Sequence, residues 1–145
     1  MKVAIGADHA GYRLKEHLRA CLLGWGHDVI DLGTTSTESV DYPDFGAAVG
    51  RAVAEGRAER GVAICGSGIG ISIAANKVPG VRAALVQDPL AARLSREHND
   101  ANVVCFGERL VGIALAEAAL EVFLMTPFSG GRHAGRVDKL RALDR

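Results

Sequence analysis

The sequence predicts a single α/β domain over residues 1–145, in which a doubly wound sheet of five parallel strands carries helices on both faces. Two observations support this fold class. Short apolar runs alternate five times with segments of helical spacing, which is the pattern of βα units. The runs are continuously apolar, as strands are when helices cover both faces of their sheet. The length also fits one domain, and no repeat or linker divides the chain.

Three strand–helix units make up the N-terminal half. The expected elements are strands at 2–8, 28–33 and 61–65, a helix at 9–26, a helix marked by the apolar spacing of 45–53, and a third helix opened by the loop GIGISIAANK at 68–77. Gly24 and Gly26 are expected to close the first of these helices.

Two further units and a tail make up the C-terminal half. The expected elements are strands at 81–88 and 102–107, a helix from Pro89 to about His98, an almost entirely apolar helix at 112–125, and a last helix around Val137, Leu140 and Leu143, after the polar segment SGGRHAGR. The apolar helix is expected to be buried, in the core or against another subunit. The segment 129–145 is expected to pack as a tail helix, on its own domain or on a partner subunit.

The simplest order for these strands is 2-1-3-4-5, a Rossmann-like arrangement with its switch point between the first and third strands. Ligands of such sheets bind beyond the carboxyl ends of the strands at the switch point. In this chain those ends are Asp8–His9 and Cys65–Gly66. The sequence therefore predicts a ligand site between these two pairs.

Composition argues against several classes of partner. Seventeen Lys and Arg balance seventeen Asp and Glu, so no basic excess indicates nucleic acid. No apolar run approaches the roughly 20 residues of a membrane span, and the N-terminus lacks the layout of a signal peptide. A cytoplasmic protein is expected. Cys21, Cys65 and Cys105 form no C-x-x-C pair, and their spacing to histidines predicts no metal site.

The glycine loop after the third strand admits two interpretations. Gly66, Gly68 and Gly70 resemble a dinucleotide fingerprint, but the sixth position is Ile71 instead of glycine. A P-loop is excluded because Lys77 lies too far along the chain. The alternative is an anion or oxyanion cradle, in which backbone N–H groups and a helix N-terminus converge on one point.

Cys65 lies at the mouth of that loop, where the field of the helix stabilises a thiolate. It is either a reactive thiol or a small core residue that ends a strand. Cys105, at a similar strand position, and Cys21, on an apolar helix face, are expected to be core residues.

Three other groups of residues could take part in binding or catalysis. Asp8 is either a helix N-cap with His9 in the first turn or, with His9, part of the ligand site. His98 and Asn99 end the fourth helix, where a histidine is favourable with or without a further role. Arg132 and Arg136, with His133, form a basic cluster that either binds phosphate in forked geometry or lies free on the surface.

Together these motifs resemble the type B ribose-5-phosphate isomerases, a family that also includes allose-6-phosphate isomerases and galactose-6-phosphate isomerase subunits. The resemblance covers essentially the whole chain. It rests on five segments in order: GADHAG, DYPDF, CGSGIGISIAANK, SREHNDANV and GGRHAGRV.

The resemblance implies an aldose–ketose isomerase that interconverts ribose 5-phosphate and ribulose 5-phosphate through an enediol, without metal or cofactor. It also implies residue roles. Cys65 is the base that moves a proton between C1 and C2, His98 assists opening of the furanose ring, and Asn99 lies beside the reacting carbons. The enediolate oxygens are held by Gly66, Ser67, Gly68, Ile69 and Gly70, the sugar hydroxyls by Asp8 and Tyr42, and the phosphate by His9, Arg109, Arg132 and Arg136.

Two positions place the chain within that family. One branch lacks the cysteine and uses a glutamate six residues later, but Ile71 stands at that position here, which leaves Cys65 as the base. Members of the cysteine branch usually carry threonine at the position of Ser67, so this chain keeps the hydroxyl and lacks a methyl group.

The predicted topology adds a homodimer. Cys65 ends a strand, whereas His98 and Asn99 end a helix and precede the next strand, so they lie at opposite edges of the sheet. They can share a site only across a two-fold axis, which predicts an obligate dimer with composite sites; assembly into a tetramer stays open. Another aldose phosphate as substrate (allose 6-phosphate, galactose 6-phosphate or a tetrose phosphate) and a non-catalytic nucleotide- or phosphate-binding module remain the alternatives.

Overall fold

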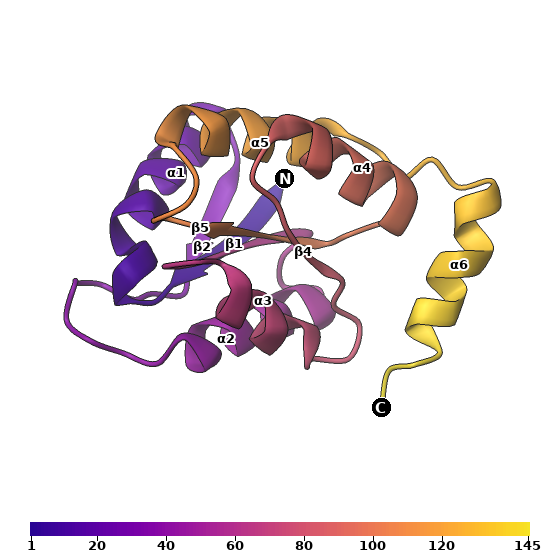
Figure 1. Ribbon diagram of the computed structural model, residues 1–145, viewed down its shortest axis with the longest axis horizontal. Helices are drawn as coiled ribbons and strands as arrows, with labels where there is room; N and C mark the ends of the chain where they lie inside the picture. The colour runs from indigo at the N-terminus through magenta and orange to yellow at the C-terminus, as the bar shows by residue number, and fades with distance from the viewer.

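The computed structural model describes residues 1–145 and contains the expected five-stranded parallel sheet (Figure 1). The strands are β1 (Lys2–Ala7), β2 (Asp28–Asp31), β3 (Arg60–Cys65), β4 (Ala83–Leu85) and β5 (Val103–Gly107). β5 and all of β3 except its first residue are buried, as their uninterrupted apolar sequences predict. β4 is short, only partly buried and lies at the edge of the sheet.

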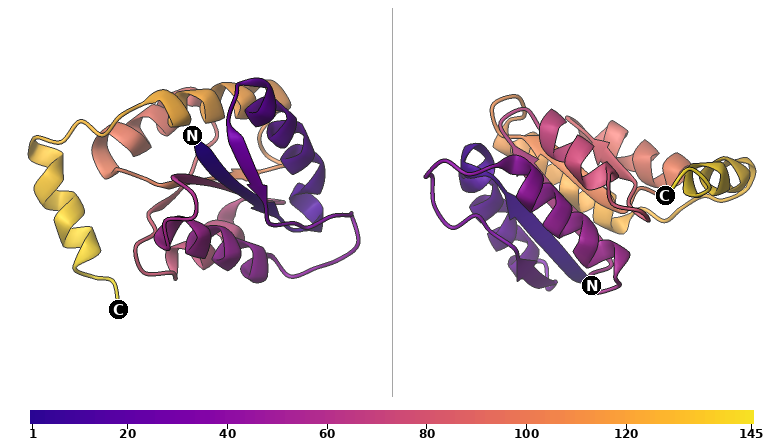
Figure 2. Two further views of the ribbon diagram at one scale, coloured as in Figure 1. Left: turned by 180° about the vertical axis from the view of Figure 1, so that it is seen from behind. Right: turned by 90° about the horizontal axis from the view of Figure 1, so that it is seen from below.

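Helices cover both faces of the sheet. They are a 3₁₀ turn η1 (His9–Gly11) and the helices α1 (Tyr12–Gly24), α2 (Tyr42–Ala54), α3 (Ile69–Asn76), α4 (Pro89–Asn99), α5 (Ile113–Met125) and α6 (Arg132–Arg141). Figures 1 and 2 show α1, α4 and α5 on one face, α2 and α3 on the other, and α6 standing to one side of the body. The doubly wound α/β class is therefore confirmed. None of these helices is both long and apolar enough to span a membrane.

The predicted order of the last two strands is wrong. The sheet runs β2-β1-β3-β5-β4, where 2-1-3-4-5 was expected. Both orders are compatible with right-handed βαβ crossovers, so the difference lies in the face of the sheet that α4 covers. The chain passes from β3 to β4 through α3 on one face of the sheet and skips the position next to β3. It then returns through α4 on the opposite face, and β5 fills the skipped position between β3 and β4. This return puts α4 beside α1 and α5, so that both faces of the sheet are covered.

The start of the last helix also differs from the expectation. α6 begins at Arg132, inside the polar segment that was expected to precede the helix. In that segment Gly130 and Gly131 have positive φ, so the chain turns there and the helix can start directly afterwards. α5 was expected to be buried in the core or against another subunit, and within one chain only one of its faces is covered. Ile113 and Met125 of that helix are 56% and 75% exposed.

Candidate active site

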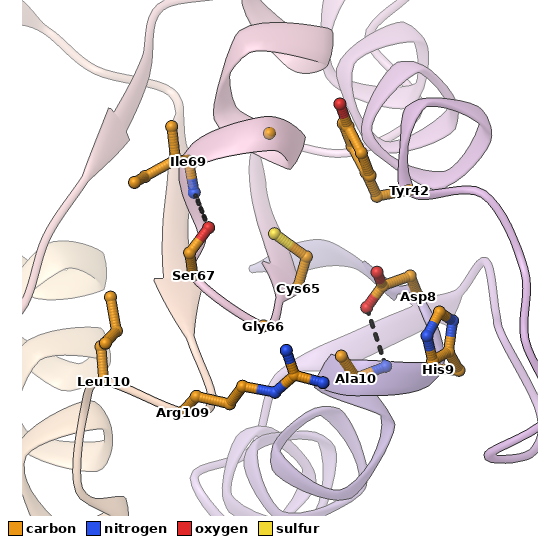
Figure 3. Close-up of a pocket in the computed structure, with 11 residues that line it drawn as sticks. Asp8, His9, Ala10, Tyr42, Cys65, Gly66, Ser67, Ile69, Arg109 and Leu110 are labelled. Carbon is orange, nitrogen blue, oxygen red and sulfur yellow. Dashed lines mark hydrogen bonds between the residues drawn. The ribbon is translucent and has the colours of Figure 1, made fainter.

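A cavity of about 490 Å³ opens beyond the carboxyl ends of β1 and β3, at the switch point where the sequence predicts a ligand site. Its volume is within the range of small-molecule sites. Figure 3 shows the residues that line it: Asp8, His9, Ala10, Tyr42, Cys65, Gly66, Ser67, Ile69, Gly70, Arg109 and Leu110.

The glycine loop lies directly on the backbone of β5. Gly68 has φ +77°, and a Cβ at this position would lie 2.8 Å from the carbonyl carbon of Phe106 and 2.9 Å from the amide nitrogen of Gly107. Only glycine satisfies both the left-handed backbone and the close approach. The loop therefore turns sharply at Gly68, and α3 begins with its N-terminus at the cavity.

Cys65 is the last residue of β3, and its sulfur points into the cavity (Figure 3). The side chain is buried, at 4% exposure, yet it lines the cavity wall. The amide of Gly68 donates a hydrogen bond to the Cys65 sulfur over 3.1 Å. This donor fixes the position of the sulfur at the cavity wall.

The other two cysteines have surroundings that oppose ionisation. Cys105 lies in the core as expected, whereas Cys21 is only partly buried, so its expected core position is wrong. Burial strongly raises the pKa of Cys105, which is fully enclosed in the core. Partial burial, followed by the hydrogen bond to Glu117, raises the pKa of Cys21 to about 11. All three cysteines are free thiols.

The N-terminus of α3 lies at the cavity, where the sequence predicts a cradle for negative charge. Helix N–H groups of the first turn have no partner within the helix, and here no N-cap side chain takes them up. The hydroxyl of Ser67 accepts a hydrogen bond from the amide of Ile69 over 3.2 Å, which closes the loop onto the helix (Figure 3). Amides at this end of α3 thus lie beside the Cys65 sulfur, on the wall of the same cavity.

Asp8 caps η1, and it also lies on the cavity wall. One carboxylate oxygen accepts hydrogen bonds from the amides of Ala10 and Gly11, each over 3.0 Å, and so caps η1. The residue is 5% exposed and also lines the cavity. His9 beside it is oriented by Val40, whose backbone lies 3.1 Å from the ring Nδ1.

Tyr42 and Arg109 close two sides of the cavity. The ring of Tyr42, at the start of α2, lies so close to Gly70 that a Cβ there would come within 2.6 Å of it. Arg109 follows β5, and its amide donates to the carbonyl of Gly66 over 3.0 Å. No salt bridge forms between Arg109 and a carboxylate of the chain, so its charge is available to an anion in the cavity.

Four of the expected site residues do not line the cavity: His98, Asn99, Arg132 and Arg136. The ring of His98 stacks on that of His133, with centroids 4.3 Å apart and planes at 16°. Desolvation, followed by the charges of His98, Arg132 and Arg136, lowers the pKa of His133.

The strand register puts His98 at the far end of the sheet from Cys65. Cys65 pairs with Gly107 at one end of β3, and Gly61 pairs with Val103 at the other. Gly61 also donates to the carbonyl of Asn102, so the chain just after α4 lies at this second end. With a rise of about 3.3 Å per residue, Gly61 and Cys65 are about 13 Å apart. The expected separation of the two groups within one chain is therefore found.

Two lining residues were not expected from the sequence. Ala10 lies in η1 between His9 and Gly11, and Leu110 follows Arg109 in the loop after β5. Neither carries a reactive group, so no chemical signal singles it out. The only indication in the sequence that they line the site is their position close to Asp8 and next to Arg109 along the chain.

The chain is similar to proteins of one family along nearly its whole length. Residues 3–140 match the model of the Ribose/Galactose Isomerase family. Over 143 residues the chain is 47% identical to Ribose-5-phosphate isomerase B of Escherichia coli, covering 99% of this chain and 96% of that protein. It is 46% identical to Galactose-6-phosphate isomerase subunit LacB of Clostridium acetobutylicum, covering 86% of this chain and 72% of that one.

Solved structures agree with this similarity. Ribose-5-Phosphate Isomerase B of Clostridium thermocellum superposes with a TM-score of 0.97 at 54% identity, covering 99% of this chain and 97% of that one. The type B ribose 5-phosphate isomerase of Trypanosoma brucei superposes with a TM-score of 0.95 at 49% identity, covering 99% and 98%.

Proposed function

Because the chain belongs to the ribose/galactose isomerase family, we propose that it interconverts ribose 5-phosphate and ribulose 5-phosphate through an enediol. The observation that carries this proposal is the Cys65 sulfur at the cavity wall, with the Gly68 amide donating to it and the N-terminus of α3 beside it. We also propose that the protein is cytoplasmic, because its three free cysteines fit a reducing compartment.

In the proposed reaction Cys65 acts as a thiolate base. It takes the proton from C2 of the open-chain aldose, and the electron pair of that C–H bond forms the C1–C2 double bond while O1 gains negative charge. A proton then passes from O2 to O1 of the enediolate, which moves the negative charge to O2. The same thiol returns its proton to C1 as the electron pair of O2 forms the ketose carbonyl. The amides at the start of α3 and the hydroxyl of Ser67 stabilise the enediolate oxygens, because they are fixed donors where charge develops.

The substrate phosphate is proposed to bind at the side of the cavity with Arg109 and His9. Arg109 is exposed and unpaired, and guanidinium groups bind phosphate in forked geometry. Phosphate binding would orient the sugar with its aldehyde end toward Cys65 and its hydroxyls toward Asp8 and Tyr42.

A homodimer would complete the site. In the proposed dimer, His98 and Asn99 of one chain reach the cavity of the other, where His98 assists opening of the furanose ring. Arg132 and Arg136 then add cations for the phosphate, and the tail that carries α6 packs across the two-fold axis. The exposed side chains of Ile113 and Leu110 are apolar surface for such an interface.

The direct test uses purified protein with ribose 5-phosphate while ribulose 5-phosphate is followed over time. Turnover supports the proposal, and no turnover with folded protein contradicts it. The similarity to a galactose-6-phosphate isomerase subunit makes an aldohexose 6-phosphate the second candidate. The ratio of kcat/KM for ribose 5-phosphate to that for allose 6-phosphate and galactose 6-phosphate distinguishes the two, and the five-carbon sugar is expected to be preferred.

A further inference from the structure

Outside the cavity, three side chains that commonly bind metal ions converge between α1 and α5. They are His17, Cys21 and Glu117, and their ligand atoms all lie within 4.8 Å of one another. No other group of three histidine, cysteine or acidic side chains in the chain comes together in this way. None of the three residues lines the candidate active site.

The two helices hold these side chains in a fixed relation. His17 and Cys21 are four residues apart on α1, so they lie one turn apart on the same face. Glu117 reaches them from α5, which packs on the same side of the sheet (Figure 1). One oxygen of the Glu117 carboxylate serves both partners, pairing with the ring nitrogen Nε2 of His17 and accepting from the Cys21 sulfur over 3.4 Å. The three ligand atoms therefore already face a common point.

The chemistry of the three groups selects a particular class of ion. Binding of a metal ion would displace the proton of Cys21, so that a thiolate, an imidazole and a carboxylate act together. This set suits zinc and similar transition metals, whereas magnesium and calcium need oxygen ligands. Metal–ligand bonds of about 2.0 to 2.3 Å put the ligand atoms of a tetrahedral site about 3.5 Å apart. The present ligand atoms, all within 4.8 Å of one another, are separated on the same scale.

An ion can reach this position from solvent. The side chains of His17 and Glu117 are each 39% exposed, and Cys21 is partly buried beneath them. Three protein ligands with solvent on the fourth side leave one coordination position for water.

We propose that His17, Cys21 and Glu117 bind one zinc-class divalent ion per chain, with water as the fourth ligand, and that the ion clamps α1 to α5. The site is separate from the isomerase chemistry and does not depend on it. Cys21 and Glu117 are far apart in the sequence and meet only in the folded chain, so the ion binds the folded state selectively and stabilises it.

Cobalt(II) is a suitable probe, because a thiolate ligand gives a sulfur-to-cobalt charge-transfer band and a four-coordinate site gives intense visible bands. The full-length protein is stripped of metal, kept reduced and titrated with Co²⁺. One equivalent is expected to bind with both sets of bands, and Zn²⁺ is expected to displace it and raise the melting temperature. The absence of saturable binding in the folded protein would overturn the proposal.

Variants assign the ligands. Cys21→Ser is expected to abolish the charge-transfer band, and Glu117→Gln, which keeps the size of the side chain, is expected to weaken Co²⁺ binding by at least about tenfold. Cys65→Ser is the matched control and is expected to bind Co²⁺ as the wild-type protein does. A charge-transfer band that survives in Cys21→Ser, or that disappears in Cys65→Ser, would place the metal elsewhere and overturn the assignment, as would unchanged affinity in Glu117→Gln.

Discussion

Cys65 and His98 lie at opposite ends of the sheet, although both belong to the segments that resemble the isomerase family. Cys65 pairs with Gly107 at the carboxyl ends of β3 and β5. His98 is in the last turn of α4, and the chain that follows it meets the sheet at the amino end of β3. A site that uses both side chains therefore has to draw them from two chains.

Replacing the proposed base is expected to remove turnover without unfolding the protein. Cys65→Ala should lower kcat with ribose 5-phosphate by a factor of roughly 10² to 10⁴, the contribution of a positioned acid–base group. The control is Cys105→Ala, which deletes a thiol of the same size from the neighbouring strand β5, away from the cavity. Activity of Cys65→Ala close to that of the control would exclude Cys65 as the base.

Gly70→Ala tests the position of the Tyr42 ring. The added Cβ would lie 2.6 Å from that ring, and because the ring is at the end of a flexible side chain, Tyr42 should move. We expect kcat/KM to fall roughly ten- to hundredfold through misplaced substrate contacts. The helix itself should not be weakened, since alanine has the higher helix propensity.

A double-mutant cycle distinguishes this cause from damage to the loop. In a Tyr42→Ala background, Gly70→Ala should have little further effect on kcat/KM, because the displaced group is gone. An equal loss in both backgrounds would mean that the alanine acts on the loop backbone.

Arg96 is expected to anchor the end of α4 that carries His98. Its buried guanidinium donates to the Asp100 carboxylate over 2.8 Å and to the carbonyls of Ala101 and Thr126. Arg96→Met removes this donor from both carbonyls and leaves Asp100 only the longer contacts with Arg82 and Arg141, at 3.4 and 3.5 Å. The variant should lower the free energy of unfolding by about 3 kcal/mol in urea titrations.

The matched control for Arg96 is on the same helix. Arg93 is 53% exposed and pairs loosely with Glu97 over 3.7 Å, so Arg93→Met should change the free energy of unfolding by less than about 0.5 kcal/mol. Equal losses for the two variants would show that the buried contacts of Arg96 add nothing.

The stack of His98 on His133 should make the docking of α6 sensitive to pH. The pKa of docked His133 is lowered, so between that value and the undocked value of about 6.5 the undocked ring binds more protons. Docking is therefore complete above about pH 6.5 and weakens as the pH falls below it.

Hydrogen exchange of the α6 amides, corrected for intrinsic rates, measures this docking at about pH 7.5 and about pH 5.5. Protection is expected to fall at the lower pH in the wild-type protein and to change less in His133→Gln. Protection independent of pH in the wild-type protein would contradict the account.

Local patterns predict the parts of the fold that depend on neighbouring residues. The alternation of apolar runs and helical segments identifies the five strands, and the strand ends at Asp8 and Cys65 predict the position of the cavity. The Asp88 carboxylate also caps α4, where Pro89 predicts a helix start.

Long-range packing decides the features that were missed. Both strand orders obey the right-handed crossover rule, and the choice depends on which face α4 covers. The proximity of Glu117 to Cys21 likewise requires α1 and α5 to pack on one face, and no local pattern contains that information. Leu110 reaches the cavity only because the loop after β5 is tied to the glycine loop through Arg109 and Gly66.

The composite site is the central claim, and mixing two inactive variants tests it most directly. Cys65→Ala and His98→Ala homodimers are each expected to be inactive, since every site lacks one group. Subunits unfolded together and refolded at equal ratio should form mixed dimers with one intact site, recovering about one quarter of wild-type activity. Recovery near that value is the predicted result. No recovery, with mixed dimers present, would show that each site draws both residues from one chain and would contradict the account.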